Sequence, residues 1–127
     1  AQILLYPVTN ACMNTASYHT YAQGCGLDAN VMAWFIEQYV EVTERTNPRV
    51  SPYFADVTKA PKAFIVVAEN DVLKDEGWLY AKKLQQAGVE VEAIEMNGLI
   101  HSYFTTNAVF AEEIEQTIER IVSFLGK

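Results

Sequence analysis

Two segments of the chain are apolar without interruption, and a proline bounds each of them. Residues 3–6 form the first segment, which Pro7 closes, and residues 63–68 form the second, which follows Pro61. Continuous apolarity over about four to eight residues is typical of a strand buried on both faces, as in a parallel sheet. Residues 89–94 read Val-Glu-Val-Glu-Ala-Ile. This alternation predicts a strand with one wetter face near a sheet edge.

Three further segments carry apolar residues at helical spacing. The first begins after Asp28, which fits an N-cap, and ends near Val42. The second begins at about Asp75 and stops before Gly88, and the third follows residue 107. The expected core positions are Met32, Phe35, Ile36, Tyr39 and Val40 in the first helix, Leu79 or Tyr80, Ala81, Leu84 and Ala87 in the second, and Phe110, Ile114, Ile118, Ile121 and Leu125 in the third.

The order of these elements predicts the fold class. A strand, a polar excursion over residues 10–26, a helix, a strand, a helix, a strand and a final helix follow one another. Strands that alternate with helices form parallel pairs joined by right-handed crossovers. We therefore expect an α/β fold with about three parallel strands and crossover helices, in which residues 1–127 form a single partial domain.

The start of the chain and its composition indicate that something else covers part of this domain. The chain opens at Ala1 without a methionine and runs directly into the first predicted strand. Half of its 127 residues are hydrophobic, which is a high share because a small domain has much surface to cover. Removal of an initial methionine is one explanation of the start. We favour a cut through a longer chain.

Composition and charge argue against several classes of function. The net charge of −7 argues against a nucleic-acid-binding surface. Two histidines and two cysteines without a Cys-x-x-Cys motif argue against a zinc site, and we expect no metal and no cofactor. No run reaches the roughly 18 apolar residues of a membrane span, and no signal peptide is visible, so we expect a cytoplasmic protein. The sequence leaves open whether Cys12 and Cys25 form a disulfide.

Two ionisable residues follow predicted strands at the edge where parallel sheets bind ligands. Asp71 comes after the second strand and His101 after the third, and ligands of open parallel sheets bind beyond the carboxyl ends of the strands. A histidine there can take a proton from a hydroxyl nucleophile, while a carboxylate on its other ring nitrogen fixes the tautomer. From the residues alone, Asp71 as a helix cap and His101 as an ordinary polar loop residue remain open.

The sequence around both residues resembles a known family. Residues 68–77 read Ala-Glu-Asn-Asp-Val-Leu-Lys-Asp-Glu-Gly, similar to the acid loop of hormone-sensitive-lipase-like esterases, which is approximately A-E-x-D-P-L-x-D-E-G. Residues 98–104 read Gly-Leu-Ile-His-Ser-Tyr-Phe and resemble the family's histidine loop, G-x-x-H-G-F. Residues of the same kind as the family's also stand at Leu5-Tyr6-Pro7, Trp34-Phe35, Ser51-Pro52 and Tyr80-Ala81. The resemblance covers essentially the whole chain in one register.

The resemblance implies a function and residue roles. It implies the C-terminal portion of a serine carboxylic-ester hydrolase, an esterase or lipase of the α/β-hydrolase fold, with Asp71 as the triad acid and His101 as the triad base. Asp75 is then best interpreted as a helix cap. The complete enzyme would act on a small-molecule ester without a metal or cofactor. The segment that borders an acyl pocket in this family includes three residues that we expect to form plain helix core, Met32, Trp34 and Phe35.

The chain also departs from the family pattern. Val72 stands where proline is usual, which predicts a looser acid loop, and Ser102 adds a side chain where glycine is usual. The nucleophile elbow G-x-S-x-G and the oxyanion loop rich in His and Gly are missing, since no such glycines flank Ser17, Ser51, Ser102 or Ser123. Gly24-Cys25-Gly26 does not fit either, because Gln23 stands two residues before Cys25. We therefore expect this chain alone to be inactive.

Other classes of function remain open. The chain could be a catalytically incomplete module that self-associates or binds its missing N-terminal half through the bare edge of its first strand. It could be a relative that only binds small ligands, or an unrelated small α/β binding domain in which Asp71 and His101 lie far apart. The main interpretation predicts that these two residues face each other at the carboxyl edge of the sheet. It also predicts that the isolated chain forms an oligomer or aggregates.

Overall fold

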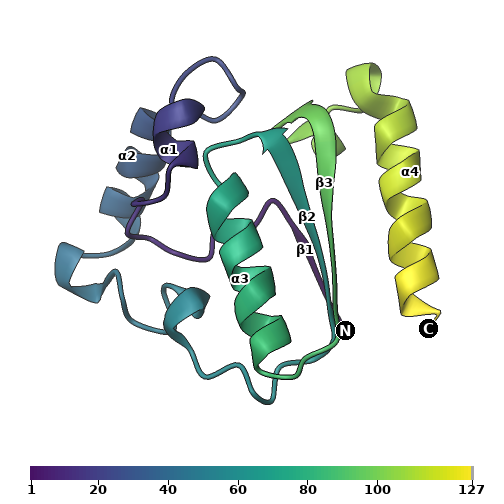
Figure 1. The fold of residues 1–127 in the computed structure, drawn as a ribbon. Helices are drawn as coiled ribbons and strands as arrows, with labels where there is room; N and C mark the ends of the chain where they lie inside the picture. The colour runs from purple at the N-terminus through teal and green to yellow at the C-terminus, as the bar shows by residue number, and fades with distance from the viewer. Residues whose placement is uncertain (127) are drawn as a thin grey trace.

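A parallel sheet of three strands forms the centre of the protein. A computed structural model describes residues 1–126 and places β1 at Gln2–Leu5, β2 at Ala63–Asn70 and β3 at Val91–Ile100. The strand order is β1-β2-β3, and both pairings are parallel (Figure 1). The predicted α/β class and its three parallel strands are confirmed.

The helices lie around this sheet. They are α1 at Ser17–Thr20, α2 at Ala29–Tyr39, α3 at Lys74–Gln86 and α4 at Asn107–Leu125, with 3₁₀ turns at Val42–Glu44, Pro52–Phe54 and Tyr103–Thr105. Figure 1 shows α3 on one side of the sheet and α4 on the other, with α1 and α2 beyond α3. The sheet is therefore covered on both faces, as parallel sheets generally are.

The central strand supplies the core on both faces. Successive residues of a strand point to opposite faces, so Ile65 and Val67 pack against α3 while Phe64 and Val66 pack toward α4. All four are 0–1% exposed. This two-sided burial explains why the sequence of β2 is apolar without alternation.

α3 approaches β2 so closely that one position requires glycine. A Cβ added at Gly77 would lie 2.6 Å from Val67 Cγ1, which is nearer than real Cβ atoms come to their neighbours. One turn further, Tyr80 is buried at 7% exposure, whereas Leu79 is 41% exposed. Tyr80 is therefore the core position of the two that the helical spacing allowed.

The segment that connects β1 to β2 packs against the loop that follows β2. Met32 and Ile36 of α2 are buried against Val72 and Leu73. α2 ends at Tyr39 instead of near Val42, because the backbone of the next residue is extended. The prediction of a helical core is thus confirmed for only part of the stripe, and the buried part supports the segment after β2.

The aromatic residues of α2 depart from the predicted core. Trp34 is 57% exposed, Phe35 50% and Tyr39 69%. The rings of Trp34 and Phe35 contact each other with centroids 5.4 Å apart. The interpretation of Trp34 and Phe35 as plain helix core is therefore wrong, since helical spacing puts Trp34 on the face opposite Met32 and Ile36 and Phe35 at the margin of the buried stripe.

The last strand and the last helix also differ in detail from the prediction. β3 continues to Ile100, well past residue 94, because Asn70 pairs with it beyond a register shift. In α4 the buried positions are Thr117 and Phe124, while Ile118 is 46% exposed. Phe110, Ile114 and Ile121 pack against the core as predicted, whereas Leu125 is exposed like Ile118, so the predicted stripe is confirmed at three of its five positions.

A membrane-spanning helix, a metal-binding cluster and a disulfide are absent from the described residues. Within residues 1–126, no helix is long and apolar enough to cross a membrane. The same residues contain no cluster of three or more His, Cys, Asp or Glu side chains that could hold a metal ion. Cys12 and Cys25 are free thiols, so the disulfide that the sequence left open is not formed.

A buried carboxylate ties α3 to the segment after β1. Glu76 is 1% exposed, and its Oε1 accepts the backbone N–H groups of Thr9 at 2.6 Å and Asn10 at 3.0 Å. Among the described residues, neither Glu76 Oε2 nor the Tyr18 hydroxyl has a hydrogen-bond partner of good geometry. Burial raises the pKa of Glu76 to about 7, although the two N–H donors lower it. Burial, and then the nearby Glu76 charge, raise the pKa of Tyr18.

We expect Glu76 to make the protein less stable as the pH rises. Its pKa in the fold, about 7, lies above the ordinary 4.5, so the fold favours the protonated carboxyl. That stabilisation is complete below about pH 4.5 and is lost as the pH rises through about 7. The side chain of Glu76→Gln stays neutral at every pH. The free energy of unfolding of this variant, relative to that of the parent protein, should therefore increase by about 2 kcal/mol between about pH 5 and about pH 8. Urea unfolding measures this difference, and an unchanged difference would contradict the account.

Candidate active site

Asp71 and His101 lie directly beyond the carboxyl ends of neighbouring parallel strands. β2 ends at Asn70 and β3 at Ile100, so each candidate is the next residue in the chain. The pairing of β2 with β3 shifts its register between Ala68 and Asn70, after which Asn70 pairs with Ile100. Such irregularities re-aim the side chains next to them. Here the two strands deliver both side chains to one point of the sheet edge.

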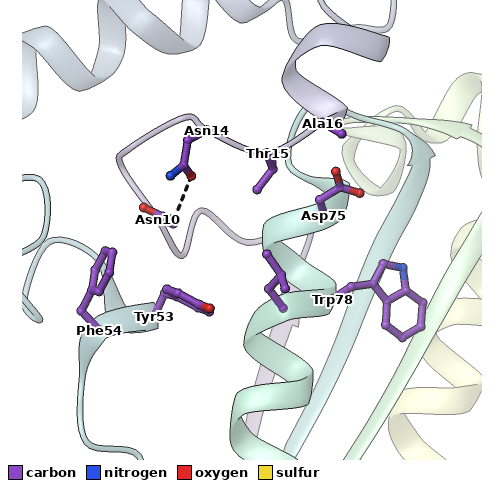
Figure 2. A pocket seen from close by; sticks show the side chains of 9 residues that line it. Asn10, Asn14, Thr15, Ala16, Tyr53, Phe54, Asp75 and Trp78 are labelled. Carbon is purple, nitrogen blue, oxygen red and sulfur yellow. Dashed lines mark hydrogen bonds between the residues drawn. The ribbon is translucent and has the colours of Figure 1, made fainter.

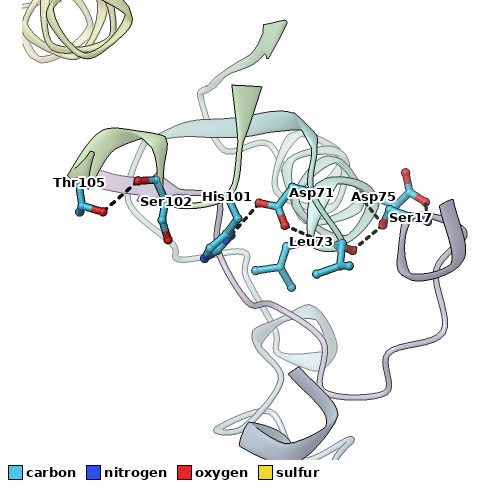
Figure 3. Close-up of polar contacts among 8 residues, drawn as sticks. Ser17, Asp71, Leu73, Asp75, His101, Ser102 and Thr105 are labelled. Carbon is cyan, nitrogen blue, oxygen red and sulfur yellow. Dashed lines mark hydrogen bonds and ion pairs between the residues drawn. The ribbon is translucent and has the colours of Figure 1, made fainter. Parts of the chain in front are cut away.

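A short hydrogen bond joins the two side chains (Figure 3). His101 Nδ1 lies 2.8 Å from Asp71 Oδ2, and the exposed fraction of the side chain is 18% for His101 and 0% for Asp71. The other carboxylate oxygen, Oδ1, accepts the backbone N–H of Leu73 at 2.9 Å. A carboxylate that accepts from Nδ1 leaves Nε2 of the ring as the proton acceptor. The distance contradicts the alternative in which the two residues lie far apart.

The acid loop is held although valine replaces the usual proline. Val72 is fully buried, and its backbone carbonyl accepts the Ser17 hydroxyl at 2.6 Å. Asp75 is not a helix cap, because Leu73 stands at the N-cap position of α3. Its Oδ2 instead accepts the backbone N–H of Ser17 at 2.8 Å. The described residues therefore show an anchored loop where the sequence predicted a looser one.

Tyr6 is a third residue of this edge, and the sequence analysis did not single it out as a site residue. It follows β1 directly, and its ring lies against the His101 ring with centroids 4.6 Å apart and planes 58° apart. Burial, and then the charge of Asp71, raise the pKa of Tyr6. Its position directly after a predicted parallel strand was the sequence feature that could have identified it as a site residue. An aromatic residue at that position is equally typical of the core.

The residue after His101 adopts the backbone conformation that favours glycine. Ser102 has φ +65° and ψ +13°, in the left-handed region. Its carbonyl accepts the hydroxyls of Thr105 at 2.9 Å and Thr106 at 3.1 Å. The glycine that is usual here in the resembling family thus has a backbone reason, and in this chain the following turn holds the serine in place. Next along, Tyr103 is fully buried and packs edge-on against Tyr6.

A glycine of the excursion lies against the histidine loop. Gly26 has φ +87°, and a Cβ there would lie 3.2 Å from the His101 backbone oxygen and 3.3 Å from Ile100 Cδ1. Gly24 has φ +79° but nothing within 4 Å of such an atom. Within the segment Gly24-Cys25-Gly26, which does not fit the nucleophile pattern, Gly26 therefore packs against the backbone of His101.

No nucleophile is paired with the histidine in the part of the chain that the structure covers. Ser17 and Ser51 are buried, and their hydroxyls donate to backbone carbonyls. Across residues 1–126, no serine hydroxyl or cysteine thiol is hydrogen-bonded to His101. Among the described residues, the arrangement is therefore a hydrogen-bonded carboxylate and imidazole with no serine or cysteine paired to the ring.

An open cavity elsewhere does not coincide with this pair. Its volume is about 600 Å³, and Figure 2 shows residues of α3, of the turn at 52–54 and of the segment 10–16 around it. It is lined by Asn10, Asn14, Thr15, Ala16, Tyr53, Phe54, Asp75, Trp78 and Leu79. Neither Asp71 nor His101 contributes to it. The candidate site therefore rests on the hydrogen-bonded pair and not on the presence of this cavity.

Comparison with known proteins identifies the family. Residues 1–105 match the family model described as α/β hydrolase fold. An ethyl acetate hydrolase of Pseudomonas putida is 34% identical over 126 residues, which cover 98% of this chain and 39% of that protein. A carboxylesterase of Mycobacterium tuberculosis is 34% identical over 121 residues, which cover 91% and 38%. The chain belongs to the α/β-hydrolase family, in its hormone-sensitive-lipase-like group of esterases and lipases.

Solved esterase structures superpose on the same fold. The hyperthermophilic esterase of Pyrobaculum calidifontis matches with a TM-score of 0.89 and 36% identity, over 96% of this chain and 41% of that chain. A thermostable esterase of Pseudomonas putida matches with a TM-score of 0.76 and 43% identity, over 80% and 33%. The chain thus spans well under half of the length of the relatives that it matches.

We expect alanine at Gly26 to be more damaging than alanine at Gly24. Both glycines have φ in the left-handed region, where a Cβ costs about 1–2 kcal/mol. Only the Cβ at Gly26 also presses on His101 and Ile100. Gly26→Ala should therefore lower the free energy of unfolding by at least about 1 kcal/mol more than Gly24→Ala. Urea denaturation of the two variants compares them directly. Equal losses would mean that the segment does not support the histidine loop.

Proposed function

We propose that Asp71 and His101 are the acid and the base of a Ser-Asp-His triad that hydrolyses carboxylic esters. The observation that carries this proposal is the 2.8 Å hydrogen bond between His101 Nδ1 and Asp71 Oδ2 at the carboxyl edge of the sheet. Membership of an esterase and lipase group supports the reaction class. The serine would come from outside this chain, since no serine of the chain stands in the G-x-S-x-G pattern.

The chemical roles follow from the two nitrogens of the His101 ring. Asp71 accepts the Nδ1 proton and keeps Nε2 free to act as a base. Nε2 takes the hydroxyl proton as the serine oxygen bonds to the ester carbonyl carbon, and it returns that proton to the leaving alcohol as the C–O bond breaks. Water then repeats these steps on the acyl-serine and releases the acid. The buried Asp71 carboxylate stabilises the imidazolium that forms in each half-reaction.

An apolar groove offers a place for part of a small ester. Its volume is about 400 Å³, and it is lined by Val8, Met32, Phe35, Ile36, Tyr39 and Val50. Val8 stands two residues after Tyr6, whose ring contacts His101. One wall of the groove therefore belongs to the same segment after β1 that carries Tyr6. This placement supports the acyl-pocket role of α2 that the resemblance raised, and it favours an ester with an apolar portion.

A second candidate function is that of an association module. In the described residues β1 pairs only with β2, so the backbone groups of its other edge have no strand partner. The exposed aromatic side chains of α2, Trp34, Phe35 and Tyr39, add an apolar surface near the excursion. Both features suit contact with another polypeptide, either the remainder of a hydrolase or a second copy. The oligomeric state stays a prediction.

We also propose a cytoplasmic location. Cys12 and Cys25 are free thiols in the structure. Free thiols persist in the reducing compartments of the cell. Fractionation of the source organism tests this placement.

The triad proposal predicts a specific kinetic pattern in the gene product that contains this chain. With a short-chain nitrophenyl ester as substrate, His101→Gln and Asp71→Asn should each lower kcat by about a thousandfold and leave KM nearly unchanged. His19→Gln is the matched control, because His19 is the other histidine of the chain and is exposed on α1. That variant should keep full activity.

Full activity of His101→Gln would contradict the triad proposal. If that variant also keeps its ability to bind a second copy or another polypeptide, the association module is the better function. Loss of activity in all three variants together would indicate a general folding defect, and thermal unfolding of each variant distinguishes that case.

A further inference from the structure

A buried serine of the excursion contacts the acid loop at two points. Ser17 begins α1 and is 2% exposed. Its hydroxyl donates to the Val72 backbone carbonyl at 2.6 Å, and its backbone N–H donates to Asp75 Oδ2 at 2.8 Å. Its hydroxyl oxygen also lies 3.4 Å from the backbone N–H of Asp75. Figure 3 shows Ser17 and Asp75 on the far side of the acid loop from His101.

The Val72 carbonyl and the Leu73 N–H belong to one peptide group. That N–H donates to Asp71 Oδ1 at 2.9 Å, while the carbonyl at the other end of the same plane accepts the Ser17 hydroxyl. A peptide group is rigid and planar, so an atom that fixes its carbonyl also fixes the direction of its N–H. Hydrogen bonds in such a chain also polarise one another and become stronger. Ser17 is thus connected to the Asp71 carboxylate through a single rigid unit.

We propose that Ser17 is a positioning residue for the triad acid. It holds the peptide plane between residues 72 and 73, and this plane sets the orientation of the Asp71 carboxylate toward His101 Nδ1. The assignment rests on the proposed function, because orientation of Asp71 matters to catalysis only if Asp71 is the acid. Asp75 in turn holds Ser17, since its carboxylate, in the first turn of α3, accepts the backbone N–H of Ser17.

Another buried serine provides a matched control. Ser51 is 0% exposed, its hydroxyl oxygen accepts the backbone N–H of Ala11 at 2.8 Å, and it donates to the Arg45 carbonyl at 2.5 Å. It has the same chemistry and nearly the same burial as Ser17, and it also lies between β1 and β2. Within residues 1–126 it makes no hydrogen bond to Asp71, Val72 or Leu73. Ser51→Ala therefore removes comparable hydrogen bonds without touching the acid loop.

The test compares Ser17→Ala with Ser51→Ala in the gene product that contains this chain. Amide hydrogen exchange is followed at Leu73 and at Val66, a buried position of β2 that reports general opening. In Ser17→Ala the exchange rate of Leu73 relative to Val66 should rise about tenfold. With an ester substrate kcat should fall about tenfold at unchanged KM. Ser51→Ala should leave both the ratio and kcat within about twofold.

The outcomes distinguish this proposal from the proposed function. A Leu73 to Val66 ratio in Ser17→Ala that stays at the parent value would overturn the positioning role, whatever the activity. Failure of the triad itself shows elsewhere, as full activity of His101→Gln. If Ser17→Ala does not fold, Ser17→Cys is read in the same way, because it nearly keeps the volume of serine but donates a weaker hydrogen bond. An unchanged ratio in that variant also overturns the role.

Discussion

The parallel pairing of β2 with both of its neighbours is the constraint on which the rest of the structure depends. Parallel strands end at the same edge, so Tyr6, Asp71 and His101 meet there although they are far apart in the sequence. The same pairing buries both faces of β2 and requires a helix on each side. The site is therefore a consequence of strand direction, and the loops only adjust it.

Buried polar groups then fix the loops at this edge. Buried backbone N–H groups beyond the strand ends need hydrogen-bond acceptors in place of those of the sheet. Two carboxylates of α3 provide them. Glu76 accepts from Thr9 and Asn10 in the segment after β1, and Asp75 accepts from Ser17 one helical residue earlier. Neighbouring acidic residues of one helix turn thus anchor the excursion and, through it, the acid loop. This explains why the acid loop holds Asp71 in a fixed position although valine replaces the usual proline.

The sequence was sufficient for the parts that depend on local pattern. The strands, the order of elements and the places of Asp71 and His101 follow from apolar runs and from the edge rule for parallel sheets. Gly26, Ser17 and Glu76 could not be recognised, because their partners lie far away along the chain and no local spacing marks them. The extension of β3 escaped prediction for a similar reason, since it depends on a register shift in its partner strand.

The protonation and exchange of the His101 imidazole in the folded protein directly report whether the pair with Asp71 is formed. In ¹⁵N-edited proton spectra, we expect the Nδ1 proton of His101 to be shifted downfield and to exchange slowly with water, because it lies in the hydrogen bond to Asp71. The exposed His19 serves as the internal reference. A His101 imidazole proton that exchanges as fast as that of His19 would contradict the pair, and with it the proposed triad.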